Sequence, residues 1–98
     1  MAVKVLIKRT FKNVATKDIS AMLIQARSNA MKQEGYITSE TLTHAKDPHT
    51  VLVIAMWRNI SDWHNYRDSA VRQENERKYA EILQGETEYE EYHMGLAQ

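Results

Sequence analysis

Cysteine is absent from this chain of 98 residues, which excludes disulfides, thiolate nucleophiles and cysteine-based zinc or iron–sulfur sites. An excess of one charge is absent as well, because 13 basic and 13 acidic side chains cancel. Without an overall field, we expect neither nucleic acid nor a membrane surface as a partner. Basic residues do gather near the start without an aromatic platform, so we interpret them as a solvated strand edge and turn: Lys4, Lys8, Arg9, Lys12 and Lys17.

Long hydrophobic runs are also missing from the sequence. No apolar stretch approaches the ~20 residues that span a bilayer, and no charged-then-apolar leader is visible. The chain has one proline and three glycines, and it shows neither a linker nor an internal repeat. We therefore expect a cytoplasmic protein with a single domain over residues 1–98, near the small end of what folds alone.

The longest apolar run, residues 51–57 (VLVIAMW), is the most informative feature that is present. It is too short for a buried helix and has no polar alternate position, so it predicts a strand covered on both faces. A chain of this size covers one face of a small sheet with its own helices. The other cover is expected to be a second copy, which predicts a homodimer through the sheet face. Sequence parity leaves open whether Val53 or Ile54 points toward the partner.

The order of the remaining patterns predicts the fold class. Helical spacing with Asp18 in the first turn favours one helix, and N-cap signals at Asn59 and Ser61 favour another that is broken near Ala70. The expected order is strand 3–10, helix 17–33, strand 36–45, strand 51–57, helix 59–83 and strand 87–94. This is the α+β, ferredoxin-like split βαβ order, with a four-stranded antiparallel sheet and the helices on one face. The first and third strands are the most apolar, as the two central strands of that sheet should be.

Three short motifs carry a family resemblance. They are the segment 53–63 (VIAMWRNISDW), the Gly35-Tyr36-Ile37 start of the second strand and the Asp47-Pro48 turn. Together they resemble the antibiotic biosynthesis monooxygenase (ABM) family of dimeric α+β barrel proteins. The resemblance implies a dimer whose two sheets pack face to face, with a pocket in each subunit between the sheet and the helices. Some members oxidise aromatic polyketides or quinols with molecular oxygen and no metal or flavin, whereas others bind or degrade haem.

One position departs from the family pattern. Many members have a histidine nine residues after the tryptophan, and here that position is Tyr66. The haem-degrading branch has an asparagine on the first strand and a histidine on the later helix. Residues 3–9 contain no asparagine and residues 72–79 contain no histidine, so haem degradation is disfavoured.

Four aromatic residues are the candidate site. Trp57, Trp63 and Tyr36 are expected to form a substrate pocket, and Tyr66 is the candidate catalytic group because a buried hydroxyl must find a partner. The alternative is that these rings are only core packing. Oxygenation without a cofactor needs a dry pocket, a proton acceptor and a donor for the developing charge. No histidine has the spacing of paired metal ligands, so we expect no metal site. His64 is expected to face solvent. We also expect no cofactor.

Two hypotheses for function follow. The first is a cofactor-independent monooxygenase of the ABM type that acts on a small aromatic, phenolic or quinol substrate. The second is a non-catalytic dimeric α+β barrel protein that binds a small ligand or acts in a stress response. In either case the charged stretch 72–78 would be a mobile lid, and we interpret the acidic run 86–91 as a solvated edge strand.

Overall fold

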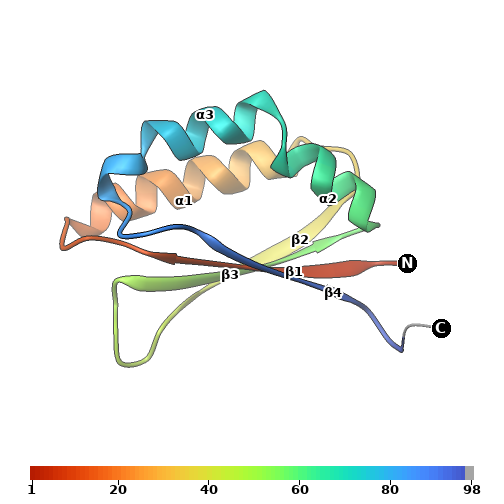
Figure 1. The fold of residues 1–98 in the computed structure, drawn as a ribbon, viewed down its shortest axis with the longest axis horizontal. Coiled ribbons are helices and arrows are strands. Elements are labelled where there is room, and N and C mark those ends of the chain that lie inside the picture. Colours follow the sequence, from red (N-terminus) through yellow and green to blue (C-terminus); the bar gives the residue numbers. More distant parts are fainter. Residues whose placement is uncertain (97–98) are drawn as a thin grey trace.

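The computed structural model describes residues 1–96 and has an α+β, ferredoxin-like fold (Figure 1). One face of a four-stranded sheet carries the helices, and the other face is open. The elements are β1 (Val3–Thr10), α1 (Thr16–Met31), β2 (Tyr36–Thr43), β3 (Thr50–Trp57), α2 (Ile60–Arg67), α3 (Ala70–Lys78), a short 3-10 helix (Ala80–Ile82) and β4 (Glu88–His93). The predicted fold class is confirmed.

The sheet has the order β2-β3-β1-β4, and all three pairings are antiparallel. The two most apolar strands, β1 and β3, are therefore central, as predicted. They pair along their full length, from Val3 opposite Trp57 to Thr10 opposite Thr50. The more polar strands β2 and β4 form the edges, where charged side chains discourage pairing with another chain.

The second helical stretch is broken in two, as the sequence indicated. The side chain of Asn59 accepts a hydrogen bond from the Asp62 amide and caps α2. The hydroxyl of Ser69 donates to the Tyr66 carbonyl and accepts from the Arg72 amide, so it ends one helix and begins the next. As a result α3 runs beside α1, while α2 lies at the end of the sheet (Figure 1).

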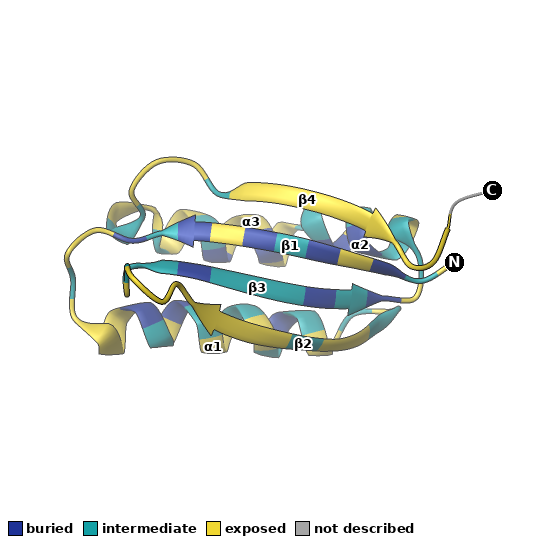
Figure 2. Ribbon diagram, turned by 90° about the horizontal axis from the view of Figure 1, so that it is seen from below, coloured by how far each residue is buried: buried dark blue, intermediate teal, exposed yellow. Residues whose placement is uncertain are grey.

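The strand register decides which side chains of β3 face the helices. Val53 packs against the main core cluster, and Ala55 and Trp57 belong to it. The alternate residues Ile54 and Met56 lie on the face that no helix covers and remain partly exposed. Figure 2 views this open face, where buried and exposed positions alternate along β1. Within one chain, β3 is thus covered on one side only.

Gly35 joins α1 to β2 at a tight contact. Its φ of +88° lies in the region that favours glycine, and a Cβ there would overlap the side chain of Asp62. Gly35→Ala is therefore expected to lower the free energy of unfolding by more than the ~1 kcal/mol of backbone strain alone.

Gly85→Ala is the matched control for this change. Gly85 has a φ of +79°, but open space surrounds it. Urea unfolding of both variants isolates the cost of the overlap with Asp62. An equal loss of stability in both variants would show that the contact with Asp62 is unimportant.

Candidate active site

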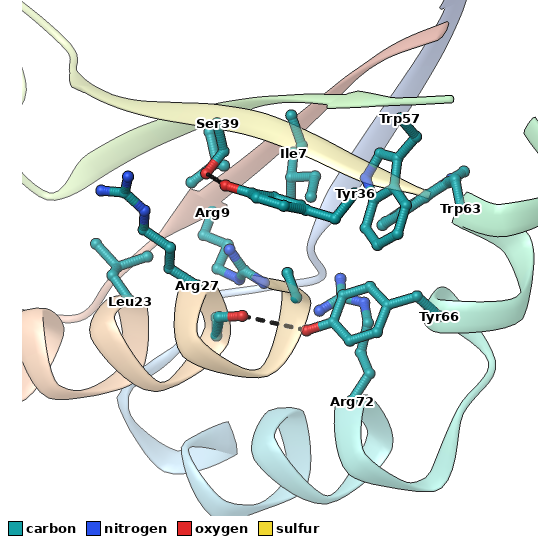
Figure 3. A pocket seen from close by; sticks show the side chains of 14 residues that line it. Ile7, Arg9, Leu23, Arg27, Tyr36, Ser39, Trp57, Trp63, Tyr66 and Arg72 are labelled. Carbon is teal, nitrogen blue, oxygen red and sulfur yellow. Dashed lines mark hydrogen bonds between the residues drawn. The ribbon is translucent and has the colours of Figure 1, made fainter. Parts of the chain in front are cut away.

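A pocket lies between the helix-covered face of the sheet and the helices α1, α2 and α3 (Figure 3). It contains all four aromatic residues that the sequence nominated. They come from three elements: Tyr36 begins β2, Trp57 ends β3, and both Trp63 and Tyr66 lie on α2. The full lining is Ile7, Arg9, Leu23, Ala26, Arg27, Ala30, Tyr36, Ser39, Val53, Ala55, Trp57, Trp63, Tyr66 and Arg72.

Trp57 is the centre of the aromatic cluster. The centroid of its ring lies 5.4 Å from that of Tyr66, on which it stacks, and 5.6 Å from that of Tyr36, which it meets edge-on. The centroid of the Trp63 ring is 6.0 Å away. Trp57, Trp63 and Tyr66 also belong to the main core cluster. The same rings therefore belong to the hydrophobic core and also line the pocket.

Tyr66 places its hydroxyl in the pocket, where it donates a hydrogen bond to the Ala26 carbonyl at 3.2 Å (Figure 3). Burial raises the pKa of Tyr66, and the nearby charges of Arg72 and Arg9 only partly oppose this. The phenol is consequently neutral near pH 7. In that state Tyr66 is a proton donor rather than a base.

Two buried arginines complete the pocket, and the sequence pattern missed both. Arg9 is 2% exposed and Arg72 is 3% exposed. The interpretation of Arg9 as part of a solvated edge is wrong, because its side chain points from β1 toward α3. The prediction of a mobile lid at 72–78 is also wrong for Arg72. Its guanidinium carbon lies 5.4–5.8 Å from the ring centroids of Trp63, Tyr66 and Tyr89.

Glu76 joins the two arginines into a buried triad. Its Oε1 accepts hydrogen bonds from Arg9 Nη2 at 2.6 Å and from Arg72 Nη1 at 2.9 Å. Burial by itself would raise the pKa of Glu76, but Arg9 and then Arg72 outweigh it and hold that pKa below its ordinary value. Two cations share one carboxylate, so the triad keeps one net positive charge beside the pocket.

This triad predicts a specific loss of stability in acid. Below the ordinary pKa of 4.5, the unfolded chain protonates Glu76 while the folded chain still holds the carboxylate charged. Falling pH therefore removes the stability that the triad contributes above that value. Glu76→Gln is expected to cost about 1–3 kcal/mol at pH 7 and to flatten the decline of stability below pH 4.5. Urea unfolding of both proteins from pH 7 to pH 3 measures this, and equal slopes would contradict it.

The last strand anchors the outer side of the pocket. Glu91 accepts hydrogen bonds from Trp63 Nε1 at 2.6 Å and from His64 at 3.0 Å, if the latter nitrogen carries the proton. The phenol of Tyr89 accepts one from Arg72 at 2.5 Å. Residues 88–91 of the acidic run belong to the exposed edge strand β4, as expected. Glu91 also fixes the Trp63 indole, and His64 is only partly exposed.

The pocket is small as it stands. Its volume is about 40 Å³, enough for a few water molecules, whereas a cavity of roughly 150 Å³ is needed to hold benzene. Leu23 and Arg27 on α1 and Ser39 on β2 line its more exposed end (Figure 3). A ring-sized ligand therefore requires these side chains to move apart.

Among residues 1–96, no group of three or more histidine, aspartate or glutamate side chains could hold a metal ion. Within the same range, no helix is both long and apolar enough to cross a membrane.

The fold and pocket define an α+β protein of the ferredoxin-like class. A model of the antibiotic biosynthesis monooxygenase (ABM) family matches residues 3–76, and the chain belongs to this family. No curated protein matches the chain significantly.

Solved structures share the fold at low sequence identity. SnoaB, a cofactor-independent oxygenase from Streptomyces nogalater, has a TM-score of 0.83 at 10% identity and covers 98% of this chain and 95% of its own. Rv0793 from Mycobacterium tuberculosis has a TM-score of 0.82 at 13% identity, covering 100% and 98%. A conserved protein from Methanosarcina mazei Go1 has a TM-score of 0.75 at 20% identity, covering 94% and 91%.

Proposed function

We propose that this protein is a cofactor-independent monooxygenase that acts on a small aromatic substrate of the phenol, quinol or anthrone class. The observation that carries the proposal is the pocket, in which aromatic rings lie next to a buried net positive charge. Membership of the ABM family and the shared fold with the oxygenase SnoaB support it.

The chemistry consumes only oxygen and an electron-rich substrate that can lose a proton. The CH2 group of an anthrone first loses a proton to water. The anion gives one electron to O2, the resulting radical pair combines into a peroxide anion at the same carbon, and this anion takes up a proton. Loss of water from the peroxide leaves a ketone. One oxygen atom enters the product and the other leaves as water, so a CH2 group and O2 give C=O and H2O.

The residues divide this work in a definite way. Trp57, Trp63 and Tyr36 hold the planar substrate and exclude water, which strengthens the electrostatic interactions inside the pocket. Tyr66 donates a proton or a hydrogen bond to the developing oxygen anion, after its hydroxyl leaves the Ala26 carbonyl. The positive triad of Arg9, Glu76 and Arg72 favours the deprotonated substrate.

We also propose that the protein is a homodimer with its two sheets face to face. The register places apolar residues of three adjoining strands on the open face, next to Lys4, Lys8 and Glu40. Apolar patches of this kind are typical of interfaces, and a two-fold symmetric dimer would bring two copies of the same patch together. The apolar residues are Leu6, Leu42, Leu52, Ile54 and Met56.

A second candidate is a non-catalytic dimeric protein that binds a small ligand. Two observations favour it: the pocket holds only about 40 Å³, and the Tyr66 hydroxyl already has an acceptor. Both observations fit a protein that binds a ligand without converting it.

Oxygen uptake separates the two candidates. Protein treated with a chelator is mixed with a panel of hydroquinones and anthrones in an oxygen electrode. The monooxygenase is expected to consume one O2 per anthrone, at a rate that the chelator does not change. Heat-denatured protein controls for spontaneous oxidation. A rate equal to that control with every substrate would leave the binding function.

A further inference from the structure

We propose that the pocket selects ligands with an anionic oxygen group, a phenolate, enolate or carboxylate, and that Arg9 is the residue that receives this group. This inference rests on the proposed function for the identity of the pocket and names the class of ligand that it takes. Its test, however, measures binding alone and needs no turnover.

The charges around the pocket carry the first part of the inference. Three arginines line it and no carboxylate does, since Glu76 lies behind Arg9 and Arg72 rather than in the lining. One carboxylate cannot neutralise both buried guanidinium groups. A buried excess of one positive charge is costly by itself, and an anion in the pocket removes that cost.

Unpaired donors carry the second part. Arg9 and Trp57 both line the pocket, and Arg9 Nε and Trp57 Nε1 are buried without a hydrogen-bond partner among the described residues. Most buried polar groups in proteins are paired, so each of these unpaired donors indicates a missing acceptor at its own end of the cavity. A deprotonated oxygen supplies acceptor lone pairs without adding a donor of its own.

The hydroxyl groups of the pocket are already engaged. The Tyr66 hydroxyl donates to Ala26, and the Tyr36 hydroxyl shares a hydrogen bond with Ser39 at 2.8 Å. The free donors of the pocket are therefore those of Arg9 and Trp57, whereas its remaining acceptors are only the lone pairs of uncharged hydroxyl groups. A neutral amide can accept from Arg9 through its carbonyl, but it gains less there than an anion of the same shape, because a hydrogen bond between charged groups is stronger.

The register gives the site a direction. Arg9 pairs with Val51 near one end of the sheet, while Trp57 pairs with Val3 at the other end. Their side chains enter the pocket from opposite ends, with aromatic rings between them (Figure 3). A flat ring between these rings would place its anionic oxygen at the Arg9 end.

Benzoate and benzamide are the matched probes, because they share one ring and nearly one shape but differ in charge. Titration of the whole protein by NMR gives both dissociation constants, and the indole N–H signal of Trp57 reports occupancy. The charge-assisted hydrogen bond predicts about tenfold tighter binding of benzoate. Equal affinities, or no binding of benzoate, would overturn the inference.

Two variants distinguish ligand binding from a purely structural role of the triad. Arg9→Gln removes the free donor and the excess charge, and is expected to weaken benzoate binding about tenfold. Glu76→Gln leaves both arginines without compensation and is expected to tighten it. Arg77→Gln, on an exposed residue of the same helix, is the control and should change nothing. Weaker binding in both triad variants would mean that the triad only supports the fold, and would reject the inference.

The outcome also separates this inference from the proposed function. Selective benzoate binding without oxygen uptake on any substrate would support the anion site and remove the monooxygenase. Oxygen uptake that benzoate does not inhibit, together with equal binding of the two probes, would keep the monooxygenase and overturn the anion site. Arg9→Gln could fail to fold, but the wild-type preference and Glu76→Gln still decide the question.

Discussion

Ile54→Lys is expected to give a folded monomer, whereas Val53→Lys is expected to unfold the chain. The two residues are neighbours on β3, but they point to opposite faces of the sheet. A lysine at position 53 would enter the core beside the aromatic pocket, where an unpaired charge costs several kcal/mol of a total stability of only about 5–15 kcal/mol. A lysine at position 54 stays in water in the monomer and meets burial only when a second copy covers the open face.

Sedimentation equilibrium and circular dichroism measure both parts of this prediction. The wild type should be a dimer at micromolar concentration, Ile54→Lys a monomer with unchanged helix and strand content, and Val53→Lys without a cooperative melt. Gln73→Lys, on an exposed position of α3, controls for the added charge and should remain a dimer. A monomeric wild type, or a dimeric Ile54→Lys protein, would reject the dimer through the sheet face.

Tyr66→Phe is expected to slow oxygen uptake about 100-fold, the effect of removing one hydrogen-bond donor to a developing oxygen anion. Because burial raises its pKa, the phenol keeps its proton near neutral pH and can act as this donor. The lost hydrogen bond to Ala26 should cost only ~1 kcal/mol of stability, so the variant stays folded. The turnover number and the thermal midpoint measure the two effects separately.

Tyr79→Phe is the control for this change. Tyr79 packs in the second core cluster, away from the pocket, with Lys78 over its ring. The control should therefore keep its rate. Unchanged turnover in Tyr66→Phe would remove Tyr66 from the site and leave only its packing role.

Sequence patterns were sufficient for the fold and for the aromatic wall of the pocket. The apolar run 51–57 predicted a central strand, and turn and capping signals at Gly35 and Asn59 divided the chain correctly. These features act over a few residues, so periodicity and local chemistry reveal them. The residues of β3 that face away from the helices could not be assigned in this way. Alternation separates Val53 from Ile54, but only the register with β1 shows which of the two faces the helices.

The charged part of the pocket could not be predicted for a different physical reason. Buried and solvated arginines look alike in a hydrophobic pattern, and burial of Arg9 depends on Glu76, which lies 67 positions away in the chain. One local signal was present: Arg72 and Glu76 stand four residues apart on one helix. That spacing is typical of an exposed ion pair on a helix surface. The pair is buried here because α3 packs onto the sheet, which the spacing alone does not show.

Turnover of an anthrone under oxygen-18 gas tests the central claim most directly. Metal-free protein, the substrate and labelled O2 are combined, and the product is weighed by mass spectrometry. The account predicts a ketone that carries one oxygen-18 atom, with one O2 consumed for each product formed. Product that contains only unlabelled oxygen, or none beyond the amount formed with heat-denatured protein, would contradict it.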